Sequence, residues 1–444
     1  MLTGKKVLVL GLAKSGMAAT RLLCHLHAQV VVNESKTLEE LQEKEELEAL
    51  GVEIVAGGQP DELFERDFDF VVKNPGIKYT QPFILRLQER KIPIYTEIEL
   101  AYQVCQPQHY IAITGTNGKT TTTSLVYEII KKRHSNTFVA GNIGIPLCEV
   151  ALKENLIENE GNYIVLEMSN FQLLNIDKFK PEIATIINLT PDHLDYMRNL
   201  DEYYASKMKI YQNQTEEDFF ILNIDDQNIL EYTKKYPIKA TQIPFSMEKN
   251  TTACIKDEMI IYDNEPVFDL HQLLMVGKHN VQNVMIALMI AKCLDIPIST
   301  IQSVLAHFKG VEHRIEFVRE LDGVKYYNDS KATNVDSTIV AINSFKQPLI
   351  ILLGGFDKGL DLSALKTLLV NAKAIICFGK AGKRFARDLQ SPYYENNLEA
   401  AILKAHQLSK AGDVVLLSPS TSSFDEFSGY EQRGKVFKDI VNHL

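Results

Sequence analysis

A glycine-rich turn early in the second quarter of the chain restricts the possible folds more than any other segment. The apolar run Tyr110–Thr114 before it is typical of a strand, and Thr121–Lys132 after it has the pattern of a helix. The turn reads Gly-Thr-Asn-Gly-Lys-Thr over residues 115–120. A strand, a glycine turn and a helix in this order allow backbone N–H groups to surround a phosphate at the helix N-terminus. The segment therefore predicts an α/β unit that binds a nucleotide.

The last two residues of this turn are suited to nucleotide chemistry. Lys119 is expected to lie on the β- and γ-phosphates, and the Thr120 hydroxyl is expected to coordinate Mg²⁺. The common GxxxxGK[ST] pattern would require glycine where the chain has Ile113, so this turn is a GxxGKT variety. The alternative is a glycine turn followed by a threonine that caps the helix, without a ligand.

Short strand-like runs alternate with amphipathic helical stretches, which predicts parallel sheets with helices on both faces. In the first hundred residues the strand-like runs are Lys6–Leu10, Val30–Asn33, Val52–Val55, Phe70–Val72 and Pro93–Tyr95. The helical stretches between them include Ser15–His27 and Leu38–Leu50. The polar segment Val104–His109 contains a proline and is expected to be a linker.

Two further α/β units are expected after this linker. The second contains the expected strands Tyr110–Thr114, Tyr163–Met168, Ile183–Leu189 and Phe219–Asn223, a hairpin arm at Cys254–Tyr262 and a buried helix at Val281–Leu294. A boundary near Phe308–Val311 precedes a hairpin turn at Asp322-Gly323. The third unit then alternates Leu349–Leu353, Leu362–Val370, Ala374–Phe378, Leu398–Leu408 and Val414–Leu417. The predicted fold is α/β in three domains, residues 1–106, 107–310 and 311–444.

A second glycine turn, Gly11-Leu12-Ala13-Lys14-Ser15-Gly16, follows the first strand-like run. Glu34 directly follows the second run, 18 residues after Gly16, at a position typical of an acid that reads a ribose or a base. A dinucleotide fingerprint would have glycine at Ala13, which disfavours NAD and leaves another nucleotide open. A tight turn without a ligand is the alternative.

Several polar residues follow other predicted strands. Glu167 ends a strand near the first glycine turn, where acids commonly hold Mg²⁺. His193, Asp195 and Lys207 come later, and each taken singly is equally well explained as a loop or helix-surface residue. The clusters Asn328–Asn334 and Ser418–Ser423 follow strands at the edge where open α/β sheets bind ligands, although loop capping also accounts for their composition.

The composition disfavours several classes of protein. The net charge of −10 disfavours non-specific binding to nucleic acid or to anionic membranes. The six cysteines are scattered without a CxxC pair, so neither a zinc ribbon nor a disulfide scaffold is indicated, and a reducing cytoplasm is expected. The apolar runs are shorter than a membrane span.

An ordered set of motifs spans all three predicted domains: Gly115–Thr121, Leu166–Leu173, Asn188–Asp195, Gly277–Asn280, Glu312–Arg314, Asn328–Asn334 and Glu431–Gly434. This set resembles the Mur ligases, bacterial enzymes that assemble the peptide of peptidoglycan. The segments 167–173 (Glu-Met-Ser-Asn-Phe-Gln-Leu) and 329–334 (Asp-Ser-Lys-Ala-Thr-Asn) look like those of the D-glutamate-adding member.

The resemblance implies a Rossmann-like first domain for the UDP end of UDP-MurNAc-L-Ala, a central P-loop domain for ATP, and a Rossmann-like third domain that contributes to ATP and D-glutamate binding. It implies an ATP-dependent, cytoplasmic ligase of peptidoglycan precursor synthesis. The sequence does not give the oligomeric state, and a monomer is the default expectation. The alanine carboxylate would become an acyl phosphate, which the D-glutamate amine attacks. Two Mg²⁺ ions and a carbamylated Lys207 are implied, since a carbamate converts a cation into an oxygen ligand.

The resemblance also assigns individual residues. ATP would contact Gly115, Thr116, Asn117, Gly118, Lys119, Thr120, Thr121, Asn280, Arg314, Asp329 and Lys331. The metal ligands would be Thr120, Glu167, His193 and Lys207, and the catalytic groups Lys119, Glu167, His193, Lys207 and Arg314. The UDP end would contact Lys14, Ser15, Gly16, Asn33, Glu34, Ser35, Asn74 and Gly76. The rest of the substrates would contact Asn142, Ser169, Thr333, Lys358, Ser423 and Tyr430.

Other classes of protein remain open at this point. A P-loop ATPase would share the glycine turn at residues 115–120. A folylpolyglutamate-type ligase or another Mur-type ligase would share the ATP-dependent ligation reaction of the central domain. A dehydrogenase is disfavoured by Ala13. Two positions depart from the family pattern: the loop Gly354–Gly359 carries its acid, Asp357, one place later than the enterobacterial enzymes, and Tyr430 replaces a phenylalanine found in some members.

Overall fold

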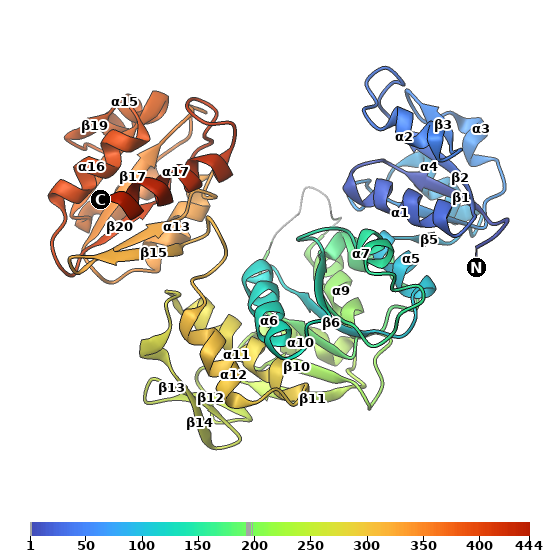
Figure 1. Cartoon of the computed structure of the whole chain (residues 1–444), viewed down its shortest axis with the longest axis horizontal. Coiled ribbons are helices and arrows are strands. Elements are labelled where there is room, and N and C mark those ends of the chain that lie inside the picture. The colour runs from blue at the N-terminus through green and yellow to red at the C-terminus, as the bar shows by residue number, and fades with distance from the viewer. Residues whose placement is uncertain (1, 192–196, 198) are drawn as a thin grey trace. The chain divides into compact units, whose positions relative to one another are not determined.

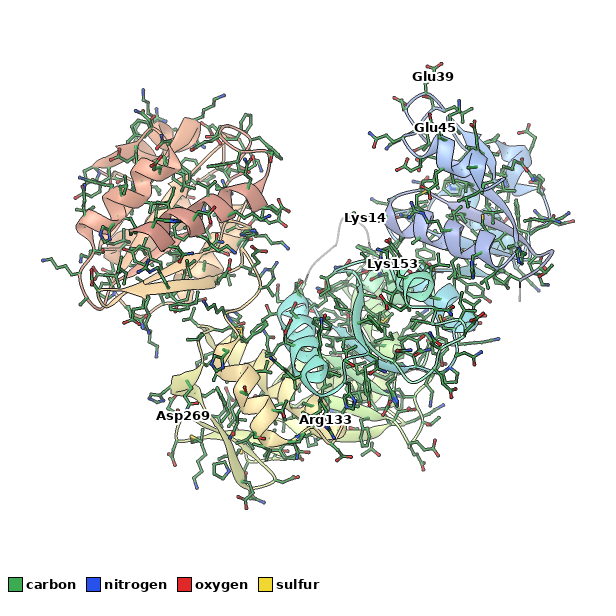
Figure 2. The ribbon with its side chains drawn as sticks, viewed as in Figure 1. Lys14, Glu39, Glu45, Arg133, Lys153 and Asp269 are labelled. Atoms are coloured by element: carbon green, nitrogen blue, oxygen red, sulfur yellow. The ribbon has the colours of Figure 1, made fainter. Side chains whose placement is uncertain are left out.

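The computed structural model describes residues 2–191, 197 and 199–444, and Figure 1 shows its ribbon. The chain divides into two compact units. One comprises residues 1–268 and 283–302, and the other comprises residues 269–282 and 303–444. The chain therefore passes from one unit to the other three times, first just before Asp269, which is labelled in Figure 2. No helix within the described residues has the length and apolar content that a membrane crossing requires.

The first sheet has five parallel strands in the order β3-β2-β1-β4-β5. Its strands are β1 (Lys6–Leu10), β2 (Gln29–Glu34), β3 (Glu53–Ala56), β4 (Phe70–Lys73) and β5 (Ile94–Tyr95). The helices are α1 (Lys14–His25), α2 (Lys44–Ala49), α3 (Asp61–Phe64) and α4 (Pro82–Glu89). Alternate residues of β1 face opposite cores, since Val7 and Val9 pack with Leu22 of α1 and Leu8 and Leu10 pack with Phe64 of α3.

The second sheet has nine strands in the order β14-β13-β12-β11-β10-β9-β6-β8-β7. They are β6 (His109–Thr114), β7 (Thr137–Gly141), β8 (Tyr163–Glu167), β9 (Ile183–Ile186), β10 (Phe219–Asn223), β11 (Thr241–Phe245), β12 (Ala253–Lys256), β13 (Met259–Tyr262) and β14 (Glu265–Asp269). The accompanying helices are α6 (Lys119–Arg133), α7 (Leu147–Lys153), α8 (Asn170–Leu173), α9 (Leu200–Met208), α10 (Gln227–Lys235), α11 (Lys278–Cys293) and α12 (Ile298–His307). Strand β6, which leads into the GxxGKT turn, lies between β9 and β8.

The third sheet has six strands in the order β15-β16-β20-β17-β18-β19. They are β15 (Glu316–Leu321), β16 (Val324–Asn328), β17 (Leu349–Gly354), β18 (Ala374–Phe378), β19 (Tyr393–Glu395) and β20 (Val414–Leu417), with β15 and β16 antiparallel. The helices are α13 (Val335–Asn343), α14 (Ser363–Leu368), α15 (Gly379–Asp388), α16 (Leu398–Leu408) and α17 (Tyr430–His443). One core lies on the side of α14 and α15, and a second lies on the side of α16 and α17.

Helix α5 (Glu97–Val104) joins the first two sheets through buried carboxylates. Glu99 accepts hydrogen bonds of 2.8–3.0 Å from the backbone N–H groups of Asp177, Lys178 and Phe179. Glu97 accepts a 3.0 Å hydrogen bond from the N–H of Cys148 in α7. Burial raises the pKa of Glu97 to about 7, against the opposing effect of that N–H group. A single apolar cluster continues from Val9 and Leu22 to Leu166, so the two sheets share a core.

The α/β class and the three sheet-bearing domains predicted from the sequence are confirmed. The predicted hairpin at Asp322-Gly323 is present, and both residues have positive φ, 50° and 77°. The predicted helix Leu38–Leu50 is too long, because α2 begins only at Lys44. The preceding residues form a turn in which the Glu40 carboxylate accepts hydrogen bonds from the Thr37 N–H and hydroxyl, both 3.0 Å.

Candidate functional site

The GxxGKT turn has a backbone that side chains would disturb. Gly118 has φ +85°, and a Cβ there would lie 2.6 Å from Oδ1 of Asn283. That buried oxygen accepts a 3.1 Å hydrogen bond from the Thr122 hydroxyl in the first turn of α6. Glycine at position 118 therefore allows the turn to pack against Asn283 of α11.

A side chain from the neighbouring strand connection holds the turn in place. Asn188 accepts a 2.9 Å hydrogen bond from the Asn117 N–H and donates one of 3.2 Å to the Asn117 carbonyl. Its own carbonyl accepts from the N–H of Thr116 at 3.0 Å. Asn188 belongs to the motif Asn188–Asp195, but the sequence alone predicts no role for it, since its partner Asn117 lies 71 residues away.

Two lysines predicted for the nucleotide and metal sites meet at one carbonyl group of this turn. The Nζ atoms of Lys119 and Lys207 each donate a 2.9 Å hydrogen bond to the carbonyl of Gly115. Lys119 also donates to the carbonyl of Thr116 at 2.8 Å. Lys207, on α9, is buried with its Nζ 4.8 Å from the centre of the Tyr203 ring. The structure thus brings both lysines to the phosphate turn.

Glu167 ends β8 beside the turn and is buried, with 1% of its surface exposed. Its Oε1 accepts a 2.6 Å hydrogen bond from the Asn142 amide. Its Oε2 is buried without a hydrogen-bond partner among the described residues. A carboxylate oxygen left in this state fits a hard cation such as Mg²⁺. His193, predicted as another metal ligand, lies outside the described residues.

Ser169, predicted to contact substrate, caps a helix. Its hydroxyl accepts a 3.3 Å hydrogen bond from the Gln172 N–H, and the Gln172 side chain accepts one of 2.9 Å from the Ser169 N–H. This reciprocal capping box fixes the start of α8 directly after Glu167 and Met168. Any role of Ser169 toward substrate is therefore additional to this local one.

The turn at residues 11–16, after β1, is equally compact. A Cβ at Gly16 would lie 1.9 Å from the carbonyl oxygen of Gly11, and Gly11 itself has φ +80°. Glu34 closes the turn, since its Oε2 accepts a 2.8 Å hydrogen bond from the Leu12 N–H. Burial opposes ionisation of Glu34, but the N–H groups of Leu12, Ser35 and Lys36 outweigh it and hold its pKa below the usual value.

The other residues predicted for the UDP end occupy different environments. Lys14 opens α1 and is exposed (Figure 2). Asn33 is buried, and its amide donates to the carbonyls of Val55 in β3 and Gly58 after it at 3.0 and 2.7 Å, so it fixes the end of β3 to the loop that follows. Asn74 connects the second loop to the turn, because its amide donates a 3.2 Å hydrogen bond to the Ser15 hydroxyl.

Gly76 belongs to the same second loop. Its N–H donates a 2.9 Å hydrogen bond to Oδ1 of Asn74. Ser35 follows β2, and its N–H donates to Oε1 of Glu34 at 2.8 Å. Two loops and one turn therefore form a connected set at the carboxyl edge of the first sheet, which is where open α/β sheets bind ligands.

Three polar loops gather at the carboxyl edge of the third sheet. Residues 328–334 follow β16, residues 418–423 follow β20 and residues 354–359 follow β17, and β20 lies between the other two strands. Ser423 is buried, Tyr430 opens α17, and Thr333 is partly exposed. The Nζ of Lys331 lies 5.7 Å from the centre of the Tyr430 ring. The residues predicted for D-glutamate thus occupy adjacent loops.

Asp329 is the buried acid of this edge. Its carboxylate accepts hydrogen bonds from the Ser418 hydroxyl at 2.7 Å and from the Ile315 N–H at 3.2 Å. Burial raises the pKa of Asp329 to about 7, while these donors and the positive charges of Arg314 and Arg433 oppose the rise. Asn280, predicted for the nucleotide, is buried in α11, and its amide donates to the Val276 carbonyl at 2.7 Å.

Asp357, the acid that is shifted by one place in the loop Gly354–Gly359, forms an ion pair with an arginine. Asp357 receives hydrogen bonds of 2.7–3.1 Å from Nε and Nη2 of Arg384 on α15. This fork holds the pKa of Asp357 below its usual value. Arg384 also donates to the carbonyl of Leu360 at 3.0 Å, so it fixes both sides of the exposed Lys358.

Arg433 links the three loops, a role that its motif in the sequence did not reveal. It is fully buried, and its guanidinium donates to the hydroxyl and carbonyl of Ser330 at 3.0 and 2.9 Å and to the carbonyl of Thr421 at 3.1 Å. A further 3.5 Å contact reaches the carbonyl of Gly354. Burial lowers its pKa to about 10, so it remains a cation.

Comparison with known proteins shows the family of the chain. Residues 5–96 match the MurD-like N-terminal domain of Mur ligases, residues 113–291 the Mur ligase middle domain, and residues 313–421 the glutamate ligase domain of Mur ligases. The UDP-N-acetylmuramoylalanine--D-glutamate ligase of Geobacillus kaustophilus is 41% identical over 99% of this chain and 98% of that protein. The chain belongs to the Mur ligase family. The enzyme of the same name from Bacillus cereus is 42% identical with the same coverage.

Solved Mur ligase structures share the fold at lower identity. UDP-N-acetylmuramate-alanine ligase MurC from Thermotoga maritima is 17% identical, with a TM-score of 0.54 over 99% of both chains. The MurF ligase of Thermotoga maritima, solved in complex with ADP, is 16% identical, with a TM-score of 0.54 over 86% of this chain and 91% of that one. These likenesses show that this Mur ligase has the fold of its family.

Proposed function

We propose that this Mur ligase joins D-glutamate to UDP-N-acetylmuramoyl-L-alanine at the expense of ATP, in peptidoglycan precursor synthesis. The observation that carries the proposal is the full-length identity of about 41% to enzymes named for this reaction. The three polar sheet edges support the proposal because each suits one of the three ligands. One glycine turn suits the phosphates of ATP, the other suits a UDP group, and the edge of the third sheet carries cations suited to an amino dicarboxylate.

The chemistry requires activation of a carboxylate, which is a poor acylating agent. The alanine carboxylate attacks the γ-phosphate of ATP and forms an acyl phosphate with release of ADP. The D-glutamate amine then attacks the acyl carbon, and phosphate leaves. Lys119 and Arg314 are suited to offset the repulsion between these anions, which makes the catalysis largely electrostatic. No nucleophile from the protein is needed.

The proposal includes Mg²⁺, which would neutralise phosphate charge when bound. Glu167 and the Thr120 hydroxyl would hold one ion, and the unpartnered Oε2 of Glu167 supports this assignment. His193 and Lys207, the latter as a carbamate, would hold a second. Lys207 is suitably buried beside the phosphate turn, at the carbonyl of Gly115.

For D-glutamate, the proposed contacts are Thr333, Lys358, Ser423 and Tyr430, with Asp329 and Lys331 toward the nucleotide. Lys358 is a suitable cation for the glutamate carboxylates, and Lys331 is suited to the same task in addition to its contact with the nucleotide. The Asp357–Arg384 pair supports this role for Lys358, because it holds the loop on both sides of the lysine.

The test is phosphate release from ATP with Mg²⁺ and UDP-MurNAc-L-Ala against a panel of L- and D-amino acids. We expect release only with D-glutamate. Release with a different amino acid would retain the ligase reaction and overturn the substrate. ATP turnover with no amino acid present would instead indicate an uncoupled ATPase.

We further propose that the enzyme acts as a monomer in the cytoplasm. The scattered free cysteines are compatible with a reducing compartment. Sedimentation equilibrium tests the first point, since a mass near 50.2 kDa is expected at micromolar concentration and a doubled mass would contradict it.

A further inference from the structure

A buried lysine lies behind the UDP-side loop and takes no part in the proposed chemistry. Lys73 is the last residue of β4, and only 1% of its surface is exposed. It directly precedes the loop that contains Asn74 and Gly76. Lysine is almost never this deeply buried unless its charge is paired.

The ammonium group of Lys73 organises this loop. Its Nζ donates hydrogen bonds to the carbonyls of Asn74 at 3.1 Å and Ile77 at 2.8 Å, and it lies 4.7 Å from the centre of the Tyr79 ring. Asn74 in turn donates to the Ser15 hydroxyl at 3.2 Å, in the glycine turn. Lys73 is thus connected to the expected anion site through a single residue.

Among the residues that the structure describes, the surroundings of Lys73 supply no balancing negative charge. Residues of β1 and α4 in the core on this face of the sheet are apolar, and Tyr79 presents its ring and phenol. The charged groups at the same sheet edge include the exposed Lys14 and Glu34, whose carboxylate is bound to its own turn. Within the described residues no carboxylate forms an ion pair with Lys73, and burial lowers its pKa to about 7.

We infer that Lys73 is a positioning residue whose buried charge is completed by the diphosphate of the UDP-linked substrate. The inference rests on the proposed function, which places a UDP group at the glycine turn. A diphosphate carries two negative charges, and attraction across a partly desolvated edge favours the protonated amine. The positive charge of Lys73 holds the carbonyls of Asn74 and Ile77 close together. The loop then has the conformation in which Asn74 contacts Ser15 of the glycine turn.

This arrangement couples substrate binding to proton uptake. In the free protein Lys73 is partly neutral near pH 7, and the bound diphosphate raises its pKa. Binding therefore takes up about half a proton at pH 7 and nearly one at pH 8. The affinity falls as the pH rises above 7, by up to roughly tenfold per pH unit. Below pH 6 the amine is already protonated and the affinity is level.

The experiment is calorimetric titration of the whole protein with UDP-MurNAc-L-Ala, whose diester diphosphate does not itself titrate near pH 7. Parallel runs at pH 6, 7 and 8, each in two phosphate-free buffers that hold that pH and differ in ionisation enthalpy, give the number of protons taken up. Lys73→Met should lose the uptake and bind about tenfold more weakly at pH 6. Lys73→Arg should bind with an affinity independent of pH, because arginine does not titrate.

Lys209→Met provides a matched control. Lys209 is also partly buried, donates to the Leu174 carbonyl at 2.9 Å and has a pKa lowered by burial, but it lies in the central domain. This variant should retain the full uptake. Binding of UDP-MurNAc-L-Ala without proton uptake by the natural protein, or with undiminished uptake by Lys73→Arg, would overturn the inference and leave the proposed function intact. Absence of any binding would overturn the proposed function itself.

Discussion

Replacement of Gly16 by alanine tests the first-sheet turn with a single methyl group. The added Cβ would lie 1.9 Å from the carbonyl oxygen of Gly11, a backbone atom that cannot rotate away. Contacts under 3.0 Å essentially never occur, so the two segments must separate by at least 1.1 Å. The N–H groups at the start of α1 move with this displacement.

The magnitude of the effect follows from hydrogen-bond geometry. An N–H donor about 2.9 Å from a phosphate oxygen would be left near 4 Å, which is beyond hydrogen-bond range. Charge-assisted bonds of this kind contribute about 1.5–3 kcal/mol each. Loss of one or two of them weakens binding of UDP-MurNAc-L-Ala by about 1.5–6 kcal/mol, which is at least roughly tenfold in Kd.

Titration calorimetry with UDP-MurNAc-L-Ala and, separately, with ATP measures this prediction. ATP affinity should stay within about twofold, because the turn proposed for ATP lies on the second sheet. Gly51→Ala is the control, since Gly51 also has positive φ, +70°, but a Cβ there meets nothing within 4 Å. It should cost about 1 kcal/mol of stability without changing either affinity. Unchanged binding of the UDP-linked substrate by Gly16→Ala would refute the assignment of the turn.

Three further predictions concern other sites. Glu167→Gln should lower kcat at least 100-fold and weaken the Mg²⁺ dependence of turnover while far-ultraviolet circular dichroism stays unchanged; full activity would exclude Glu167 as a metal ligand. Arg384→Met should raise the KM for D-glutamate about tenfold without affecting the KM for ATP, because the loop around Lys358 loses its anchor, and an equal rise in both would contradict this reasoning. Glu97, with its pKa raised to about 7, retains a proton between pH 4.5 and 7 that the unfolded chain releases, so the unfolding free energy falls as pH rises through that window. Glu97→Gln should flatten this fall in urea unfolding curves, and an unchanged slope would refute the assignment.

Local patterns in the sequence were sufficient to predict most of the secondary structure. Four buried residues, Val414–Leu417, form β20 with the expected bounds, and Leu398–Leu408 forms α16. The Asn397 side chain caps that helix by accepting a hydrogen bond from the Ala400 N–H at 2.9 Å. Each of these signals lies within a few residues of the element it specifies.

Side-chain roles were less predictable because they depend on distant partners. Asn33 is expected to contact the UDP end, yet in the structure its amide donates to the carbonyls of Val55 in β3 and of Gly58 in the loop that follows. Arg433 contacts Ser330 over a separation of 103 residues, and Lys73 is identifiable as unusual only once its burial is known. The sequence motifs located the sites, whereas packing and hydrogen bonds between segments define what each side chain does there.

The triple passage of the chain between its compact units affects how the protein can be dissected. A protease cut after Gln302 would leave residues 269–282 on the amino-terminal fragment, although they belong to the other unit. Val276 of that segment packs into the core that contains Ile351 and Leu353 of β17. A truncated carboxyl-terminal fragment, such as one prepared for inhibitor screening, would therefore expose an apolar gap and aggregate. Supplying the missing segment in trans, as in a split reporter, should restore its solubility.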